Sequence, residues 1–205
     1  MPANGEGGES VALSGQVGGT LYLVAIKAPG AVALSYQDLQ SFPDDGYRRE
    51  LVHGQLLVTP SPVGRHQRAL HRLGLLLGVA CPPNLEVLPA PYDWKLAIDT
   101  VFQPDLMVIR AEDFDPDGPL DGATPLLVVE VVSPSSRATD ITLKRYEYER
   151  AGVPAYWIMD PDAASLAVLR LEAGRYLEAA LVEGEAAYEA DWPYRLRIIP
   201  SELVR

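Results

Sequence analysis

The sequence predicts an α/β protein of the α+β kind, with a central mixed β-sheet flanked by helices and extended by additional β-hairpins. Three observations predict this fold class. The run Leu126–Val132 (LLVVEVV) is almost entirely apolar, which is typical of a strand buried on both faces. The apolar residues of Arg65–Ala80 recur at spacings of one, three and four, which indicates an amphipathic helix. The order of elements along the chain is helix, several strands, helix, several strands, and this order favours a mixed sheet with helices packed on it.

The first half of the chain is predicted to contain a tail, a short helix, a hairpin and the first long helix. Residues 1–20 are rich in Gly, Ser and Glu without any period, so we expect a flexible tail there and a single domain over residues 21–205. Ser35 is the expected N-cap of a helix over Tyr36–Ser41, and Gly54 is the expected hairpin turn. The strands expected in this half and up to the buried run are Leu21–Lys27, Tyr47–His53, Gln55–Thr59, Leu85–Leu88, Trp94–Ile98 and Asp105–Arg110.

The second half is predicted to alternate a helix with further strands. Residues 111–124 contain five acidic residues, two prolines and two glycines, so we expect a solvated loop before the buried run. A second main helix is expected over Thr139–Ala151, where Gly152 ends it. The remaining strands are expected at Ala155–Asp160, at Ser165–Leu171 and Arg175–Leu181 as a hairpin, and at Leu196–Ile199.

Composition excludes several classes of protein. The chain has 205 residues, of which 48% are hydrophobic and 22% charged, as in an ordinary globular protein. One cysteine, Cys81, cannot form an intramolecular disulfide, and the net charge of −11 argues against a general nucleic-acid coat protein. Residues Met1–Ser10 lack the basic region of a signal peptide, and the apolar stretch Thr20–Leu34 is too short and too interrupted to span a bilayer. We therefore expect a cytoplasmic protein without a membrane partner.

Two acidic residues mark the expected site. No phosphate-binding loop, dinucleotide fingerprint, nucleophile elbow or zinc spacing is present. Glu130 lies in the middle of the buried run, where an ionised carboxylate is costly unless it is paired or bound to a metal. Asp105 follows Pro104 at the head of another apolar strand. Two acids at the ends of adjacent central strands would form an oxygen-only site that suits Mg²⁺ or Mn²⁺, and such an ion can activate water and hold a phosphodiester oxygen.

Four stretches carry a resemblance to a known family. They are YRRELVHGQLLVTPSPVGRH, FQPDLMVIR, PLLVVEVVSPSSRATDITLKRYEYERAGVPAYWIMDP and LAVLRLEAGRYLEA, and in them Asp105 is followed 25 residues later (130 − 105) by Glu130. Over roughly residues 34–200, the chain resembles the Uma2 family of restriction endonucleases, formerly a domain of unknown function, within the PD-(D/E)XK nuclease superfamily. The resemblance implies a restriction-endonuclease-like fold and a Mg²⁺-dependent or Mn²⁺-dependent endodeoxyribonuclease that hydrolyses DNA phosphodiester bonds.

The resemblance also implies a set of site residues. Asp105 and Glu130 would be metal ligands together with the backbone carbonyl of Val131, and Glu50 would be an acid on the rim of the site. Lys144 would orient the attacking water or stabilise the phosphate in the transition state. The implied catalytic residues are thus Glu50, Asp105, Glu130 and Lys144.

The sequence departs from the superfamily pattern at one position. The usual lysine stands two residues after the acid, and here that residue is Val132. Lys144, on the following helix, is therefore expected to supply the cation. Simpler roles stay open: Glu50 as a solvated strand edge, Lys144 as a surface pair with Asp140, and His66 as a capping or solvent-facing residue.

Partners and rival functions complete the expectations. DNA is expected to bind weakly, in a metal-dependent and salt-sensitive manner, through basic residues near the site. These residues are Arg48, Arg49, Arg65, Arg68, Arg72, Lys144 and Arg145. One rival function is a catalytically inactive nuclease-fold module for binding or oligomerisation, and another is a phosphate-ligand binder that uses the SPSSRATD turn at a helix N-terminus. A homodimer is also expected, with Ser165–Ile199 as the surface that pairs.

Overall fold

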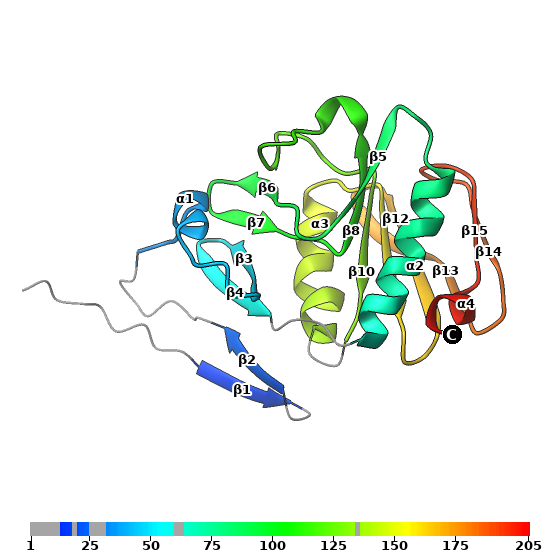
Figure 1. The fold of residues 1–205 in the computed structure, drawn as a ribbon, viewed down its shortest axis with the longest axis horizontal. Coiled ribbons are helices and arrows are strands. Elements are labelled where there is room, and N and C mark those ends of the chain that lie inside the picture. Colours follow the sequence, from blue (N-terminus) through cyan, green and yellow to red (C-terminus); the bar gives the residue numbers. More distant parts are fainter. Residues whose placement is uncertain (1–12, 18–19, 25–31, 60–63, 134–135) are drawn as a thin grey trace, which may run out of the picture.

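The computed structural model describes residues 13–17, 20–24, 32–59, 64–133 and 136–205. Within these residues the chain forms a six-stranded sheet, a seven-stranded sheet and a small two-stranded sheet (Figure 1). None of the helices in this part of the chain is long and apolar enough to cross a membrane.

The six-stranded sheet is the centre of the molecule. Strands β10 and β11 run parallel, and every other pair of neighbours in this sheet is antiparallel. The sheet is therefore mixed, as the sequence predicts. In sheet order, its strands are β13 (Arg175–Glu183), β12 (Ser165–Glu172), β11 (Ala155–Asp160), β10 (Leu127–Val131), β8 (Leu106–Arg110) and β5 (Leu85–Pro89).

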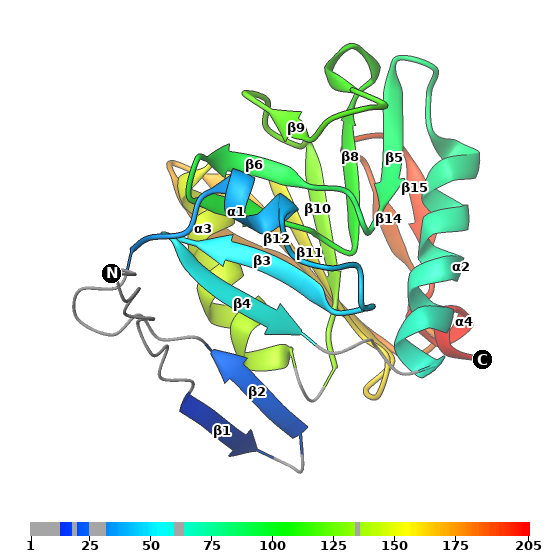
Figure 2. The same ribbon diagram turned by 60° about the vertical axis from the view of Figure 1, so that its left-hand side comes forward.

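The seven-stranded sheet lies beside the central one and carries the β3–β4 hairpin (Figure 2). The predicted hairpin turn is confirmed, because His53 and Gly54 both have positive φ, at 51° and 76°. In sheet order, the strands are β1 (Leu13–Val17), β2 (Thr20–Val24), β4 (Gln55–Thr59), β3 (Arg48–Val52), β7 (Thr100–Phe102), β6 (Trp94–Ala97) and β9 (Leu120–Asp121).

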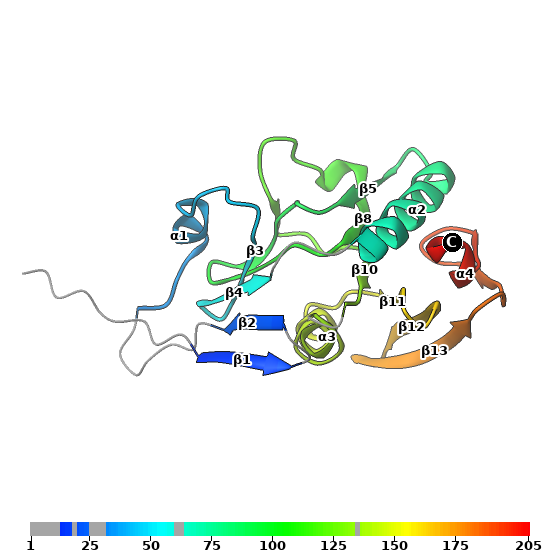
Figure 3. The ribbon, with the colours of Figure 1, turned by 60° about the horizontal axis from the view of Figure 1, so that its bottom comes forward.

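Two long helical segments cover opposite faces of the central sheet (Figure 3). The apolar stripe of α2 (Gly64–Ala80) packs on one face through Ala69, Leu73 and Leu77. The other face is covered by α3 (Arg145–Arg150), which continues directly from a π-helical turn, η2 (Thr139–Lys144). The shorter helices are α1 (Tyr36–Gln40), η1 (Ala111–Asp113) and α4 (Pro200–Val204).

Alternation along β10 decides which side chain meets which helix. Val129 and Val131 belong to the apolar cluster under α2, whereas Val128 belongs to the cluster under α3. Because successive side chains of a strand point to opposite faces, Glu130 lies on the α3 side with Val128. The hydrogen bonds from Lys144 and Tyr148 to Glu130 confirm this placement.

Several local expectations are wrong in detail. The segment 111–124, predicted as a loop, contains η1 and the short strand β9, which pairs with β6. Part of the predicted tail, residues 13–17, forms β1 by pairing with β2, and most of the remaining tail lies outside the described residues. The strands β7 and β14 (Tyr188–Ala190) and helix α4 are not predicted, because three-residue strands and one-turn helices carry too few residues to show a period. The small third sheet pairs β14 with the predicted strand β15 (Leu196–Ile198).

Candidate functional site

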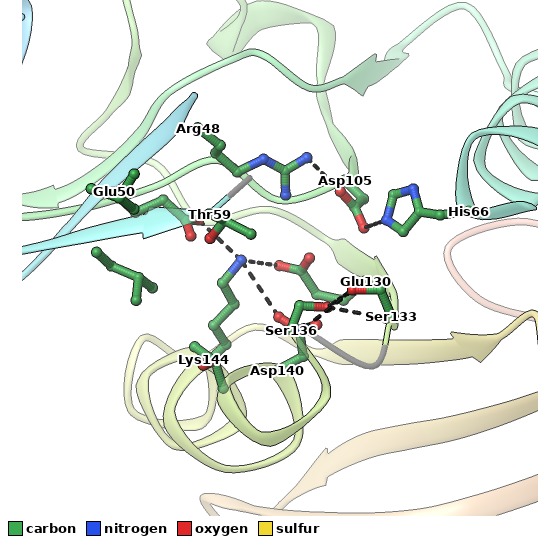
Figure 4. A pocket seen from close by; sticks show the side chains of 13 residues that line it. Arg48, Glu50, Thr59, His66, Asp105, Glu130, Ser133, Ser136, Asp140 and Lys144 are labelled. Carbon is green, nitrogen blue, oxygen red and sulfur yellow. Dashed lines mark hydrogen bonds and ion pairs between the residues drawn. The ribbon is translucent and has the colours of Figure 1, made fainter. Parts of the chain in front are cut away.

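A small polar cavity lies where the two larger sheets meet helix α2 and the π-helical turn (Figure 4). Its volume is about 30 Å³, which is room for one or two waters or one ion. The polar side chains that line it come from six separate segments of the chain. They are Arg48, Glu50, Thr59, His66, Asp105, Glu130, Ser133, Ser136, Thr139, Asp140 and Lys144.

Lys144 is the central cation of this cavity. Its Nζ lies 3.0 Å from an Oε1 atom of Glu50 and 3.0 Å from Oε1 of Glu130, and 3.7 Å from Oδ1 of Asp140. All four side chains are buried. Burial opposes the charged form of a lysine, but three carboxylates face this ammonium group and raise the pKa of Lys144 above its ordinary value. Lys144 is therefore charged at neutral pH.

Glu130 reaches the cavity from β10, beneath α3. Its Oε1 accepts hydrogen bonds from Lys144 Nζ and, at 2.8 Å, from the Tyr148 hydroxyl one helical turn later. Burial raises the pKa of Glu130 to about 8, and the neighbouring acids Asp140 and Asp105 act in the same direction against the lysine. Burial likewise raises the pKa of Asp140 to about 6. The cavity thus holds carboxyl groups that an added cation would ionise.

Asp105 lies directly before β8 and is held by three donors. Arg48 Nη2 is 2.6 Å from Oδ1, and the His66 ring and the backbone N–H of Val131 are 3.0 and 2.8 Å from Oδ2. Burial alone would raise the pKa of Asp105, but the Arg48 guanidinium and the His66 hydrogen bond hold it well below the usual range. Of the two acids Asp105 and Glu130, Asp105 is the one that is fully ionised at neutral pH. The antiparallel register pairs Leu106 with Val129, and its continuation brings Asp105 opposite Glu130.

Glu50 enters from the β3–β4 hairpin and is buried rather than solvated. Its exposed fraction is 1%, because β3 lies inside the seven-stranded sheet between β4 and β7. The backbone N–H of Gln103 donates to Oε1 at 2.8 Å. The other oxygen, Oε2, is buried without a hydrogen-bond partner, which is uncommon and is expected where a ligand completes the site. The simpler interpretation of Glu50 as a solvated strand edge is wrong.

The structure brings all four predicted catalytic side chains, Glu50, Asp105, Glu130 and Lys144, to the same cavity. Their catalytic roles, and the metal-ligand role of the Val131 carbonyl, stay predictions. The simpler interpretation of Lys144 as a surface partner of Asp140 is wrong in one respect, since that i,i+4 pair is buried and Lys144 also contacts two other acids.

His66 and Tyr148 are site residues that the sequence reasoning missed. His66 is buried against Asp105, so its interpretation as a capping or solvent-facing residue is wrong. Its Nδ1 atom is buried without a partner. A signal was present in the sequence, because His66 continues the stripe formed by Ala69, Leu73 and Leu77 at helical spacing. Tyr148 follows Lys144 by four residues and so shares its face of the helix.

Of the seven basic residues expected to hold DNA, Arg48 and Lys144 line the site cavity, and Arg49 lines the cavity next to it. Arg68 and Arg72 lie on α2 and donate to the backbone carbonyls of Val204 and Glu202 near the C-terminal helix. Arg48 is paired with Asp105, and the remaining members of the set also have protein partners. Those partners are Asp45 for Arg49, Asp162 for Arg65, the Tyr176 carbonyl for Arg145 and three acids for Lys144. Each of the seven side chains is therefore paired within the protein in this structure, and DNA binding through them stays a prediction.

The turn proposed for phosphate binding is only partly described. Ser133 and Ser136 line the cavity, and their hydroxyl groups lie 3.2 Å apart. Residues 134–135 of this turn lie outside the described residues.

The charges in the cavity fit a divalent cation in one respect. Four acids carry −4, and Lys144 with Arg48 carries +2, so the cluster has a net charge of −2 when every acid is ionised and His66 is neutral. Carboxylate oxygens are the ligands that Mg²⁺ and Mn²⁺ prefer, and the unpaired oxygen of Glu50 is available. Within the described part of the chain, however, no three His, Cys, Asp or Glu side chains are arranged as a ready metal site.

Comparisons with known proteins found one family model and solved structures that resemble this chain. A family model named Uma2, with the description "Putative restriction endonuclease", matches residues 35–192. A solved structure from Anabaena variabilis ATCC 29413, described as a "putative nuclease belonging to DUF820", has the same fold with a TM-score of 0.67. The two chains are 17% identical, and the match covers 84% of this chain and 99% of the other. No curated protein matches the chain significantly.

Proposed function

Because the chain belongs to the Uma2 family, we propose that it is a divalent-metal-dependent endonuclease that hydrolyses DNA phosphodiester bonds. The observation that carries the proposal is the position of Lys144, whose Nζ lies 3.0 Å from both Glu50 and Glu130 in a buried cavity that also contains Asp105. An acid-rich cavity with one fixed ammonium group would hold a cation beside the phosphate and keep a donor next to both, which phosphodiester hydrolysis requires.

Asp105 and Glu130 have distinct roles in the proposed site. Asp105 is fixed in its ionised form by Arg48, His66 and the Val131 N–H, so it is a preorganised anionic ligand. Glu130 is held by Lys144 and Tyr148 and loses its proton when more positive charge enters the cavity. Mg²⁺ or Mn²⁺ would be held by these two acids and the Val131 carbonyl, and when bound it would supply charge neutralisation at the phosphate and activation of the attacking water.

Lys144 is proposed to act on the reacting phosphate. Its ammonium group has three donors, and in this structure it faces three carboxylates at 3.0–3.7 Å. If one of these carboxylates held a cation, an ammonium donor of Lys144 would be left for a phosphate oxygen or for the attacking water. Because the lysine is preorganised and desolvated, its removal should lower the rate of hydrolysis about 100-fold to 1,000-fold, the range seen when one such electrostatic donor is lost.

The test combines metal binding with cleavage. Mn²⁺ is titrated calorimetrically into the wild-type protein and into Glu130→Gln, and both proteins are assayed for nicking of supercoiled plasmid with and without EDTA. Glu147→Gln is the matched control, because Glu147 is a buried acid of α3 that pairs with His53 outside the cavity. We expect metal binding and metal-dependent nicking in the wild type and in Glu147→Gln, and loss of both in Glu130→Gln.

The same experiment separates the second candidate function. An inactive nuclease-fold module is favoured by the absence of a ready metal cluster among the described residues and by Val132 at the position of the usual lysine. Metal binding without nicking of double-stranded DNA, single-stranded DNA or RNA would establish that module instead. Absence of metal binding would refute the metal-dependent mechanism. The homodimer through Ser165–Ile199 and the cytoplasmic location stay predictions from the sequence.

A further inference from the structure

A second and larger cavity lies next to the proposed active site. Its volume is about 440 Å³, within the ~300–1,000 Å³ range of small-molecule pockets. It is bounded by α1, the segment between α1 and β3, the first turns of α2 and the loop after β5. Two residues connect it to the site: Arg48 lines both cavities, and Gln103 lines the larger one while its backbone N–H holds Glu50.

The two cavities differ in what they can accommodate. The site cavity, at about 30 Å³, has room for a water or an ion but not for a heterocyclic ring. A nucleotide whose phosphate reaches Lys144 must therefore place its own base, or that of its neighbour, outside the site cavity. The larger cavity shares the Arg48 wall and is wide enough for a base.

Two exposed aromatic rings line the larger cavity. Phe42 is 36% exposed and Tyr47 is 54% exposed, and both belong to the short segment that leads into β3. The guanidinium carbon of Arg49 lies 5.4 Å from the Phe42 ring centroid and 6.0 Å from that of Tyr47. Arg49 is itself fixed by Asp45 at 2.5 Å and by the Pro43 carbonyl at 3.0 Å. The two rings thus lie beside a fixed cation in the wall of the larger cavity, and aromatic rings and guanidinium planes are the groups on which unpaired bases stack.

The polar groups of the cavity suit a base better than a phosphate. Asp44 and Asp93 also line it, and both arginines in its wall already have carboxylate partners, so the cavity offers no free cation to an anion. Side-chain amides are present instead. Gln103 and Gln40 donate to Asp93 at 2.7 and 3.3 Å, and Gln67 lines the cavity from α2. Amides offer both donors and acceptors, as the edge of a base requires.

We propose that this cavity binds one unstacked nucleobase of the substrate strand, next to the phosphate that is cleaved. The inference rests on the proposed nuclease function and narrows its substrate class to nucleic acid with an unpaired or extruded base near the cleavage position. Phe42 and Tyr47 provide the stacking surface, and Gln40, Gln67 and Gln103 contact the base edge.

The test measures base stacking without requiring cleavage. The probe is a 12-nucleotide single-stranded oligodeoxynucleotide with one central 2-aminopurine, whose fluorescence is quenched on stacking, titrated in low salt with EDTA. Phe42→Ala and Tyr47→Ala are compared with Phe114→Ala and Tyr146→Ala. These controls remove rings of similar exposure, 40% and 51%, that lie outside the cavity, and Tyr146 is also covered by a guanidinium group.

We expect the wild type and both controls to bind the single-stranded probe, and to quench its fluorescence, more strongly than they do with the matching duplex. Phe42→Ala and Tyr47→Ala should each weaken binding about 5-fold to 150-fold, which corresponds to the ~1–3 kcal/mol of one base–aromatic stack. Equal affinity of all five proteins, or no quenching by the wild type, would overturn the proposal.

Plasmid nicking by the same five proteins keeps the two proposals apart. Nicking without an effect of Phe42→Ala or Tyr47→Ala on probe binding would refute the base site and leave the nuclease function standing. Probe binding that depends on the two rings, without nicking under any metal, would refute the nuclease function alone.

Discussion

Replacement of Lys144 by methionine is expected to lower the free energy of unfolding by about 3–5 kcal/mol at pH 8 in the absence of metal. Methionine keeps most of the volume of the side chain but removes the charge that faces Glu50 and Glu130 at 3.0 Å and Asp140 at 3.7 Å. The magnitude is that of breaking a buried ion pair by removing one partner, because at pH 8 the buried acids left behind must either stay charged without their cation or take up protons. The variant should also lose nicking activity.

The effect of Lys144→Met should depend on pH in a definite direction. The pKa of Glu130 is about 8 and that of Asp140 about 6 with the lysine present, and removal of the lysine raises both further. At pH 5.5 these carboxyl groups are protonated, so the cavity no longer holds uncompensated charge. The destabilisation should therefore be smaller at pH 5.5 than at pH 8.

Urea denaturation of wild type and Lys144→Met at the two pH values, in EDTA, measures both statements. Lys95→Met is the control: Lys95 is the other lysine among the described residues, and its partner Asp121 at 2.6 Å is largely exposed. Such a pair contributes about 1 kcal/mol or less, at either pH. A loss below about 1 kcal/mol for Lys144→Met at pH 8, or an equal loss at pH 5.5, would refute the interpretation of Lys144 as the buried counter-ion of the site.

Three further predictions concern the partners of this cation. Because the pKa values of Glu130 and Asp140 are raised, the folded metal-free chain binds more protons than the unfolded chain between about pH 5 and 8. Its free energy of unfolding should therefore fall as the pH rises, by at most ~1.4 kcal/mol per pH unit for each group. Urea denaturation at several pH values measures this slope. A slope in Glu130→Gln equal to that of the wild type would contradict the prediction. Tyr148→Phe removes the hydroxyl that donates to Glu130 at 2.8 Å and should cost about 1–3 kcal/mol, measured by urea unfolding, whereas a neutral effect would mean that Glu130 does not need this donor. Arg48→Met removes the 2.6 Å hydrogen bond to Asp105 and should cost about 1.5–3 kcal/mol by the same measurement, and a stability equal to wild type would show that His66 and the backbone hold Asp105 unaided.

The parts of the fold that follow from local periodicity could be predicted from the sequence. The stripe of Ala69, Leu73 and Leu77 gives α2 almost to its ends, and the β12–β13 hairpin follows from two apolar runs around a glycine turn. Glu130 could be singled out because it is a charged residue in a strand whose neighbours are all apolar, and its parity gives the correct face of the sheet.

The environment of each site residue could not be predicted in the same way, because it depends on contacts between distant segments. Glu50 is buried because β3 pairs with β7, which lies about 50 residues later and is only three residues long. His66 meets Asp105 across 39 residues of sequence, and Arg48 meets it across 57. Arg68 and Arg72 are drawn away from the site by carbonyls of the C-terminal helix, 136 and 130 residues later. A basic residue near a site in sequence is therefore a poor guide to a basic surface at that site.

The position of Lys144 differs from that of the lysine in the superfamily that the sequence resembles. In that pattern the cation follows the acid on the same strand, and here the corresponding residue, Val132, lies just beyond the last residue of β10. The chain instead returns through η2, whose last residue, Lys144, lies over β10 and contacts Glu130, and the next turn supplies the Tyr148 hydroxyl to the same oxygen. One helix thus delivers a cation and a neutral donor to Glu130 and brings Asp140 to the same cation, which a strand residue two positions away could not do. The charge and the hydrogen bonds that Glu130 needs are therefore set by the docking of this helix on the sheet, so substitutions that loosen α3 should impair the site even where every acid is retained.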